Sequence, residues 1–185
     1  MKYDFVVIGA GIVGLAAAFK IHSKRPFSKI AIVEKESSVA AHQTGRNSGV
    51  LHSGLYYQPG SLKAQMCLKG YSEIVEFAES HGIPYRLCGK LVVANGPEQE
   101  ARLMELAKRG EQNGLKGLSF LSPEEARERE PYVSCSQALW VPQTGVIDFK
   151  LVAKSLEKEL QLSGVDFFFD QAVKSLVPDR AGVSV

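Results

Sequence analysis

The feature that most constrains this chain is an apolar segment that runs directly into a glycine-rich turn. Residues 3–8 precede the run Gly9-Ala10-Gly11-Ile12-Val13-Gly14, which has the pattern G-x-G-x-x-G. In that pattern the first glycine permits a tight turn, the second lets the main chain approach a pyrophosphate, and the third lets the helix pack closely on the strand. Main-chain N–H groups at the helix N-terminus would then face the phosphates. The segment therefore predicts a strand–turn–helix unit that binds a dinucleotide.

A second predicted strand ends in an acid at the spacing that such a site requires. Residues 29–33 are mostly apolar, with three β-branched residues, and Glu34 follows them about 20 residues after the glycine pattern, where a carboxylate takes the ribose hydroxyls. A plain strand–turn–helix of a globular core would not explain why an acid ends the strand. Glu34, with Lys35 beside it, is therefore predicted to belong to the nucleotide site.

Composition excludes several classes of protein. The 185 residues are 45% hydrophobic and 23% charged, which is ordinary for a globular protein. A net charge of +2 without a basic cluster gives no electrostatic case for nucleic acid. The longest apolar run, residues 5–18, is broken by glycines, and we expect neither a membrane span nor a secretory signal. The three cysteines lack CxxC spacing and the four histidines are scattered, so we expect no metal site and a reduced, cytoplasmic compartment.

Periodicity and turn signals predict alternating helices and strands along the chain. Helices are expected over residues 12–23, 61–81 after Ser61, 98–112 after Pro97, a short stretch after the capping box Ser122–Glu125, and 149–162 after Asp148. Strands are expected at 85–88 and 90–94, paired with each other around Gly89, and at 165–169 and 173–177 as extensions of a parallel sheet. Residues 36–60 show little periodicity and predict a long loop, which indicates either a functional segment or a wrong assignment.

These elements predict an α/β fold with two parts. Residues 1–84 and 145–185 would form a Rossmann-like nucleotide-binding domain with a parallel sheet, and residues 85–144 the first part of an inserted, mixed α+β substrate module. The chain stops in what looks like the middle of a β meander. We therefore expect the sheet to be incomplete and the chain to be a fragment of a longer protein.

A second segment is far more specific than the glycine pattern. Residues 42–57 read HQTGRNSGVLHSGLYY, and residues 59–64 read PGSLKA. This segment resembles the flavoproteins of the D-amino-acid oxidase/glycerol-3-phosphate dehydrogenase superfamily, and within it most closely the L-2-hydroxyglutarate oxidase/dehydrogenase family. The similarity continues through residues 88–94, 124–131 and 141–148, and so covers nearly all of the chain.

The resemblance implies an activity and a cofactor. Members of this family bind FAD non-covalently and oxidise a small 2-hydroxy acid, L-2-hydroxyglutarate, to 2-oxoglutarate. They pass the electrons to an acceptor, for which oxygen, a quinone and a membrane chain stay open here. Family members are substantially longer than this chain. Bacterial members are cytoplasmic or peripheral at the inner membrane, and we expect a cytoplasmic location with the peripheral one as the alternative.

A bound FAD would need a second phosphate-binding element besides the glycine turn. Residues 44–48 offer main-chain N–H groups, hydroxyls and the guanidinium of Arg46, although a solvated surface arginine is the alternative for Arg46. The resemblance adds a main-chain contact to adenine at Val173. The predicted cofactor-binding residues are Gly9, Ala10, Gly11, Ile12, Val13, Gly14, Glu34, Lys35, Thr44, Gly45, Arg46, Asn47, Ser48, Val50 and Val173.

His52 is the candidate catalytic residue, because the resemblance places it close to the flavin. It would assist proton removal from the substrate hydroxyl; hydrogen bonding to flavin or substrate, and packing in the core, are the alternatives. Tyr56, Tyr57 and Lys63 are candidates for contact with a dicarboxylate, and simple packing of Tyr57 with an exposed Lys63 is the alternative.

Three other functions compete with this prediction. An NAD(P)-dependent dehydrogenase would share the glycine pattern but has no counterpart of residues 42–64. Another flavoenzyme of the same superfamily would oxidise glycerol 3-phosphate or an amino acid instead. Finally, the chain by itself would be a non-catalytic fragment that self-associates through open sheet edges, since an unpaired edge is a template for pairing.

Overall fold

The computed structural model describes residues 1–180 and 182–185, and its contacts divide the chain into two compact units. Unit 1 consists of residues 1–48 and 148–185, and unit 2 of residues 49–147. Residues 49–84, which the sequence grouped with the nucleotide-binding part, thus cluster with residues 85–147. It stays a prediction that residues 1–84 and 145–185 bind the nucleotide and that residues 85–144 belong to the substrate module.

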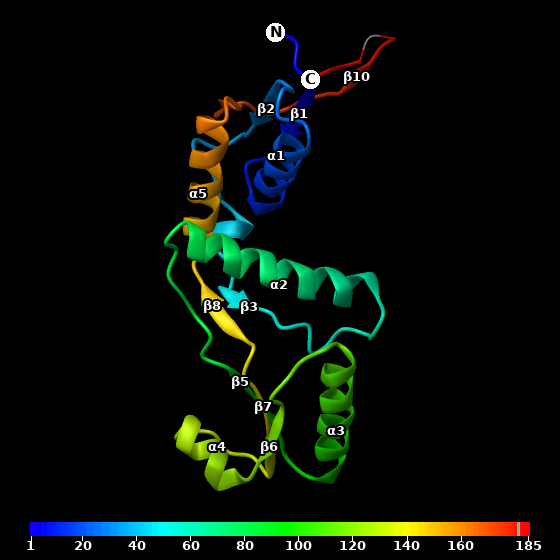
Figure 1. The fold of residues 1–185 in the computed structure, drawn as a ribbon, viewed down its shortest axis with the longest axis vertical. Coiled ribbons are helices and arrows are strands. Elements are labelled where there is room, and N and C mark those ends of the chain that lie inside the picture. Colours follow the sequence, from blue (N-terminus) through cyan, green and yellow to red (C-terminus); the bar gives the residue numbers. More distant parts are fainter. Residues whose placement is uncertain (181) are drawn as a thin grey trace. The chain divides into compact units, whose positions relative to one another are not determined.

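Unit 1 is built on a parallel sheet. Strands β1 (Phe5–Ile8), β2 (Ile30–Val33) and β9 (Asp166–Phe168) lie in the order β1-β2-β9, and both neighbouring pairs are parallel. Helix α1 (Ile12–Lys24) connects β1 to β2 and contacts α5 (Phe149–Leu162), as Figure 1 shows. The predicted parallel sheet of a Rossmann-like α/β fold is therefore confirmed.

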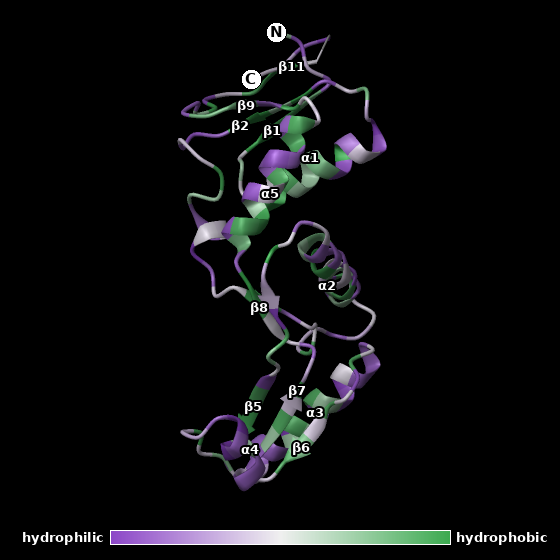
Figure 2. Cartoon of the chain, turned by 60° about the vertical axis from the view of Figure 1, so that its left-hand side comes forward, coloured by the Kyte–Doolittle hydropathy of each residue, from purple (hydrophilic) through white to green (hydrophobic). Residues whose placement is uncertain are grey.

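The two helices of unit 1 begin in different ways. Helix α1 begins at Gly11, which has no side chain to cap it, and it buries Leu15 and Ala18 completely. Helix α5 begins at Asp148, whose Oδ1 accepts a hydrogen bond from the Lys150 N–H at 2.7 Å, as the sequence predicted. Its buried residues recur at helical spacing (Val152, Ala153, Leu156 and Leu160), and green and purple residues alternate along it in Figure 2.

Unit 2 contains two antiparallel sheets and three helices. The first sheet has the order β3-β8-β4 and the second the order β5-β7-β6. The elements are β3 (Val50–Leu51), α2 (Leu62–Ser80), β4 (Tyr85–Arg86), β5 (Lys90–Ala94), α3 (Pro97–Gln112), β6 (Ser119–Leu121), α4 (Pro123–Arg129), β7 (Gln137–Val141) and β8 (Gly145–Ile147). Its main core joins α3 to β5 and β7 around Leu55, Leu103 and Leu139.

Side-chain caps fix where two helices of unit 2 begin. The hydroxyl of Ser61 accepts from the Ala64 N–H at 3.2 Å and begins α2. Ser122 and Glu125 form the predicted capping box, because each side chain accepts from the other residue's N–H, at 3.2 and 2.7 Å. Both helix starts are confirmed.

Two strand predictions are wrong. Residues 85–88 and 90–94 do not pair with each other: β4 pairs with β8, and β5 pairs with β7. Gly89 separates them because it has φ +72° and its N–H donates to the Thr144 carbonyl at 2.8 Å, which directs the chain from one sheet into the other.

The second error lies after β9. Residues 173–177 do not extend the parallel sheet; only β10 (Val177–Pro178) forms, and it pairs antiparallel with β11 (Val183–Ser184) in a separate two-stranded sheet. The chain changes direction at Asp170, where φ is +57° and the N–H donates to the Glu36 carbonyl. Val173 therefore lies outside any strand.

Candidate dinucleotide site

The glycine turn of unit 1 has the geometry that its sequence predicts. Gly9 has φ +100°, a conformation that only glycine adopts readily. A Cβ on Gly14 would lie 2.0 Å from the Gly9 carbonyl oxygen, so helix and strand can approach this closely only without a side chain. A Cβ on Gly11 would meet nothing nearer than the Thr44 hydroxyl, at 3.3 Å. The first and third glycines thus shape the turn, and the second keeps its outer surface bare.

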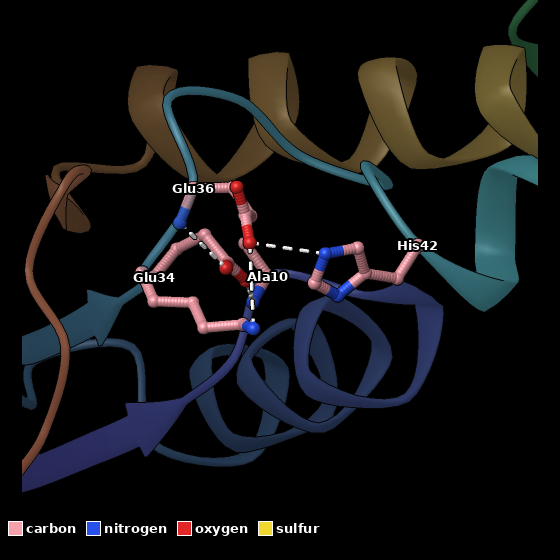
Figure 3. Close-up of polar contacts among 5 residues, drawn as sticks. Ala10, Glu34, Glu36 and His42 are labelled. Atoms are coloured by element: carbon pink, nitrogen blue, oxygen red, sulfur yellow. Dashed lines mark hydrogen bonds and ion pairs between the residues drawn. The ribbon is translucent and has the colours of Figure 1, made fainter.

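The carboxylate of Glu34 is tied to this turn by main-chain N–H groups (Figure 3). Ala10 donates to Oε2 at 2.7 Å, and Glu36 donates to Oε1 at 3.0 Å. The carbonyl of Ala10 in turn accepts from the Ala40 N–H at 3.1 Å. Each carboxylate oxygen has two acceptor positions, so Glu34 can hold the turn and still accept hydroxyl hydrogen bonds. The predicted ribose acceptor therefore lies beside the predicted pyrophosphate turn.

The charge of Glu34 is stabilised by its surroundings. Partial burial alone would raise its pKa, but hydrogen bonds from the N–H groups of Ala10, Glu36 and Lys35, with His42 nearby, hold the pKa below its ordinary value. His42 Nε2 lies 3.0 Å from Glu36 Oε1, a contact that Figure 3 also draws. Glu34 is therefore an ionised acceptor at neutral pH.

The segment after β2 folds back against the start of α1. Thr44 is buried, and its Oγ1 accepts from the Ile12 N–H at 2.9 Å, which caps the helix from a distant position. A Cβ on Gly45 would lie 2.4 Å from the Ala40 carbonyl oxygen. The amide of Asn47 donates to the Thr44 carbonyl at 2.7 Å. Segment 40–47 is thus a folded part of the site rather than an unstructured loop.

Ala40 is a residue of this site that the sequence did not reveal. Its φ is +58°, which places a non-glycine residue in the left-handed region, and the side chain is 6% exposed. An alanine carries no sequence signal for such a conformation. The pairing of His42 with Glu36 was missed as well, because it depends on this turn of the chain.

Most of the other predicted site residues are exposed or belong to unit 2. The Lys35 ammonium contacts Glu36 at 3.4 Å, and the side chains of Arg46 and Ser48 are exposed. The remaining candidates, Val50, His52, Tyr57 and Lys63, belong to unit 2. The cofactor, catalytic and substrate roles of these residues stay predictions, as do those of Val173 and of the residues in unit 1.

His52 directly follows β3, and its side chain is exposed, which disagrees with the core-packing alternative. Its carbonyl accepts a hydrogen bond from the Cys67 thiol of α2 at 3.2 Å, and burial raises the pKa of that thiol.

Among the described residues, no cluster of three or more His, Cys, Asp and Glu is placed to hold a metal ion. None of the described helices combines the length and the apolar character that crossing a membrane requires.

The arrangement in unit 1 fits the adenosine and pyrophosphate part of a dinucleotide. The first-turn N–H groups of α1 have no acceptor within the helix, as in any helix; Thr44 takes that of Ile12, and Val13 in the same turn is 80% exposed. Gly11 leaves the adjoining surface without a side chain, and Glu34 supplies carboxylate oxygens. Anion donors and hydroxyl acceptors are therefore present together, and the residues fit FAD.

Comparison with known proteins agrees with this fit. Relatives include L-2-hydroxyglutarate dehydrogenase of Indibacter alkaliphilus, 49% identical over 173 residues, and the mitochondrial enzyme of that name from Homo sapiens, 41% identical over 175 residues. The matches cover 94% and 95% of this chain, but 43% and 38% of the relatives. The chain thus spans about two fifths of the length of these relatives.

Solved structures show the same fold. The L-alpha-glycerophosphate oxidase from Mycoplasma pneumoniae, solved with FAD bound, superimposes with a TM-score of 0.90 at 27% identity, over 98% of this chain and 48% of that one. Glycine oxidase from Bacillus cereus gives a TM-score of 0.79 at 24% identity, over 98% of this chain and 52% of that one. Residues 4–185 match the family described as FAD dependent oxidoreductase (DAO). The chain belongs to this family, whose cofactor is FAD.

Proposed function

We propose that the whole protein containing this chain oxidises L-2-hydroxyglutarate to 2-oxoglutarate with FAD as its cofactor. The observation that carries the proposal is the 49% identity to a relative named L-2-hydroxyglutarate dehydrogenase over 94% of this chain. The hydrogen bond between Glu34 and the glycine turn, and the bare surface of that turn, support the proposal, because FAD needs such a site for its adenosine half.

In this proposal, unit 1 holds the cofactor. Glu34 accepts hydrogen bonds from the ribose hydroxyls, and the bare turn at Gly11 lies against the pyrophosphate. Arg46 is exposed next to the buried Thr44 and would contribute positive charge to a phosphate or to the flavin. When bound, FAD would accept the two electrons that leave C2 of the substrate.

His52 is the proposed acceptor of the proton that leaves the 2-hydroxyl. Oxidation of an alcohol to a ketone removes a hydride equivalent from carbon and a proton from oxygen, so a base is needed beside the substrate. Imidazole suits this task near neutral pH, and the side chain of His52 is exposed and available. A hydrogen bond from His52 to flavin or substrate remains the alternative role.

The test of this function is anaerobic reduction of the flavin. The purified whole protein should show flavin absorbance that L-2-hydroxyglutarate bleaches, and His52→Ala should slow the bleaching well before it lowers the flavin content. Glycerol 3-phosphate belongs in the same experiment, because the fold matches a glycerophosphate oxidase at 27% identity. Faster bleaching by glycerol 3-phosphate or by an amino acid would replace the proposed substrate.

Gly11→Ala tests the cofactor site separately. Its Cβ would be 3.3 Å from the Thr44 hydroxyl, a contact relieved by a shift of a few tenths of an ångström, so the fold should survive. The methyl group would, however, intrude where the pyrophosphate approaches the main chain. We therefore expect a lower flavin-to-protein ratio at unchanged thermal stability of the apoprotein. Unchanged flavin content would contradict the assignment.

The proposal also covers the electron acceptor, self-association and the location in the cell. The electrons would pass to oxygen, a quinone or a membrane chain, and comparing the reoxidation rates with each of them identifies the acceptor. Self-association through open sheet edges is testable by sedimentation, and a cytoplasmic or peripheral membrane location by cell fractionation.

A further inference from the structure

Unit 2 carries a cluster of hydrogen-bond donors around Tyr56, which follows His52 closely in the sequence. The Lys90 ammonium lies 3.2 Å from the Tyr56 hydroxyl and 4.3 Å from the centre of its ring. The Arg109 guanidinium donates to the Tyr56 carbonyl at 3.3 Å. Neither cation forms an ion pair with a carboxylate of the described residues. Two positive charges therefore flank one tyrosine, and no carboxylate of the described residues lies within ion-pair distance of either.

The Tyr56 hydroxyl is left as a donor. It accepts a hydrogen bond from Lys90, so its own proton is directed elsewhere, and no acceptor for that proton occurs in residues 1–180 or 182–185. The ammonium has three N–H groups, of which Tyr56 takes one. Tyr56 is 51% exposed and Lys90 is half-buried, so the cluster lies at the surface. Such a cluster presents donors and positive charge only, which suits an anion.

The turn that carries Tyr56 is held firmly in place. Leu55 is 1% exposed and packs in the core between α3 and the sheet. Asn113, at the end of α3, is 5% exposed, and its Nδ2 donates to the carbonyls of Gly54 at 3.0 Å and Tyr57 at 2.9 Å. A buried amide that uses both protons on one turn fixes the turn on either side of Tyr56. The position of Tyr56 is thus set by the core rather than by solvent-exposed contacts.

We propose that Tyr56 and Lys90 form a binding site for a carboxylate of the substrate, with Asn113 as the residue that positions Tyr56. The inference rests on the proposed function, which supplies a dicarboxylate as the substrate class. Of the three residues that the sequence suggested for this contact, it keeps Tyr56 and replaces Tyr57 and Lys63 with Lys90. The carbonyl of Tyr57 accepts from Asn113, and Lys63 is exposed on α2.

The test measures the affinity of the FAD-loaded whole protein for glutarate, a dicarboxylate without a hydroxyl group, by its perturbation of the flavin spectrum. Lys90→Met and Tyr56→Phe should each weaken glutarate binding and raise KM for L-2-hydroxyglutarate about tenfold or more, because each removes a charge-assisted hydrogen bond. The kcat should change less than about twofold, and Lys90→Arg should restore most of the affinity. Lys108→Met is the matched control: Lys108 is exposed on α3, and we expect no change.

The role of Asn113 is tested by comparing Asn113→Asp and Tyr56→Phe, singly and combined. Asn113→Asp keeps the shape of the side chain but cannot donate either hydrogen bond. It should raise KM without lowering kcat in proportion, and Tyr56→Phe should cost little more in that background, because the two residues act on the same contact. Full additivity of the two substitutions would overturn the positioning role.

The outcomes separate this inference from the proposed function. If L-2-hydroxyglutarate reduces the flavin but Lys90→Met leaves glutarate binding unchanged, the function stands and the carboxylate site is wrong. If the flavin is not reduced but glutarate binds through Lys90, the site stands and the substrate is another carboxylate. Loss of flavin in Lys90→Met, with unchanged glutarate affinity of the remaining holoprotein, would assign the cluster to the cofactor and overturn the proposal.

Discussion

Two glycines inside helices should respond in opposite ways to replacement by alanine. A Cβ on Gly14 would lie 2.0 Å from the Gly9 carbonyl oxygen, where ordinary contact begins at 3.4 Å, so α1 must move by more than about 1 Å from the turn before it. Overpacking costs about 1–3 kcal/mol, and the upper end applies because main chain cannot rotate away. Alanine returns about 1 kcal/mol of helix propensity. We expect Gly14→Ala to destabilise the protein by about 2 kcal/mol.

Gly70 in α2 is the matched control. Nothing lies within 4 Å of the Cβ that would be added there, and the residue is exposed, so Gly70→Ala should stabilise α2 by about 1 kcal/mol. Urea unfolding measures both effects, followed by far-UV circular dichroism and by the fluorescence of the single tryptophan, Trp140 in unit 2. Equal or higher stability of Gly14→Ala would refute the close approach of α1 to the turn.

Substitutions at three further positions test the site and unit 2. The pKa of Glu34 is held below its ordinary value of 4.5, so its charge stabilises the fold fully above pH 4.5. That stability is lost as the pH falls through the pKa of the folded state. The melting temperature of Glu34→Gln should therefore fall less than that of the parent on acidification below pH 4.5. Ala40→Gly should relieve the left-handed strain and leave the stability in urea equal or up to about 1 kcal/mol higher, whereas Ala40→Val should lower it. Gly89→Ala should destabilise unit 2 and shift the tryptophan emission, since its φ is +72° and its Cβ would lie 2.0 Å from the Trp140 ring.

The sequence predicted the parts of the fold that local chemistry determines. The glycine turn, the acid that ends β2 and the caps at Ser61, Ser122 and Asp148 each depend on a few neighbouring residues. The parallel order of β1, β2 and β9 followed from the same logic, because the apolar strands and the helices between them allow few arrangements.

What could not be predicted depends on partners that are distant in the sequence. Strand β4 has two residues, too few for a pattern to specify its partner, so its pairing with β8 was missed. In the cluster around Tyr56, Asn113 donates to carbonyls more than fifty positions earlier in the chain, and Lys90 donates to Tyr56 across 34 positions. Contacts of that kind leave no periodicity in the sequence, and the structure is needed to see them.

The hydrogen bond between the two ends of unit 2 has a consequence for how the chain is assembled. The Ile147 N–H donates to the Gly49 carbonyl at 2.8 Å, so the chain enters and leaves unit 2 at adjacent points. A segment with neighbouring ends is a suitable insertion, because the entropy of closing a loop grows only slowly with its length. Strand β9 follows this insertion and yet pairs with β2, which precedes it. During synthesis, the parallel sheet of unit 1 must therefore wait for all of unit 2 to be translated before strand β9 is available.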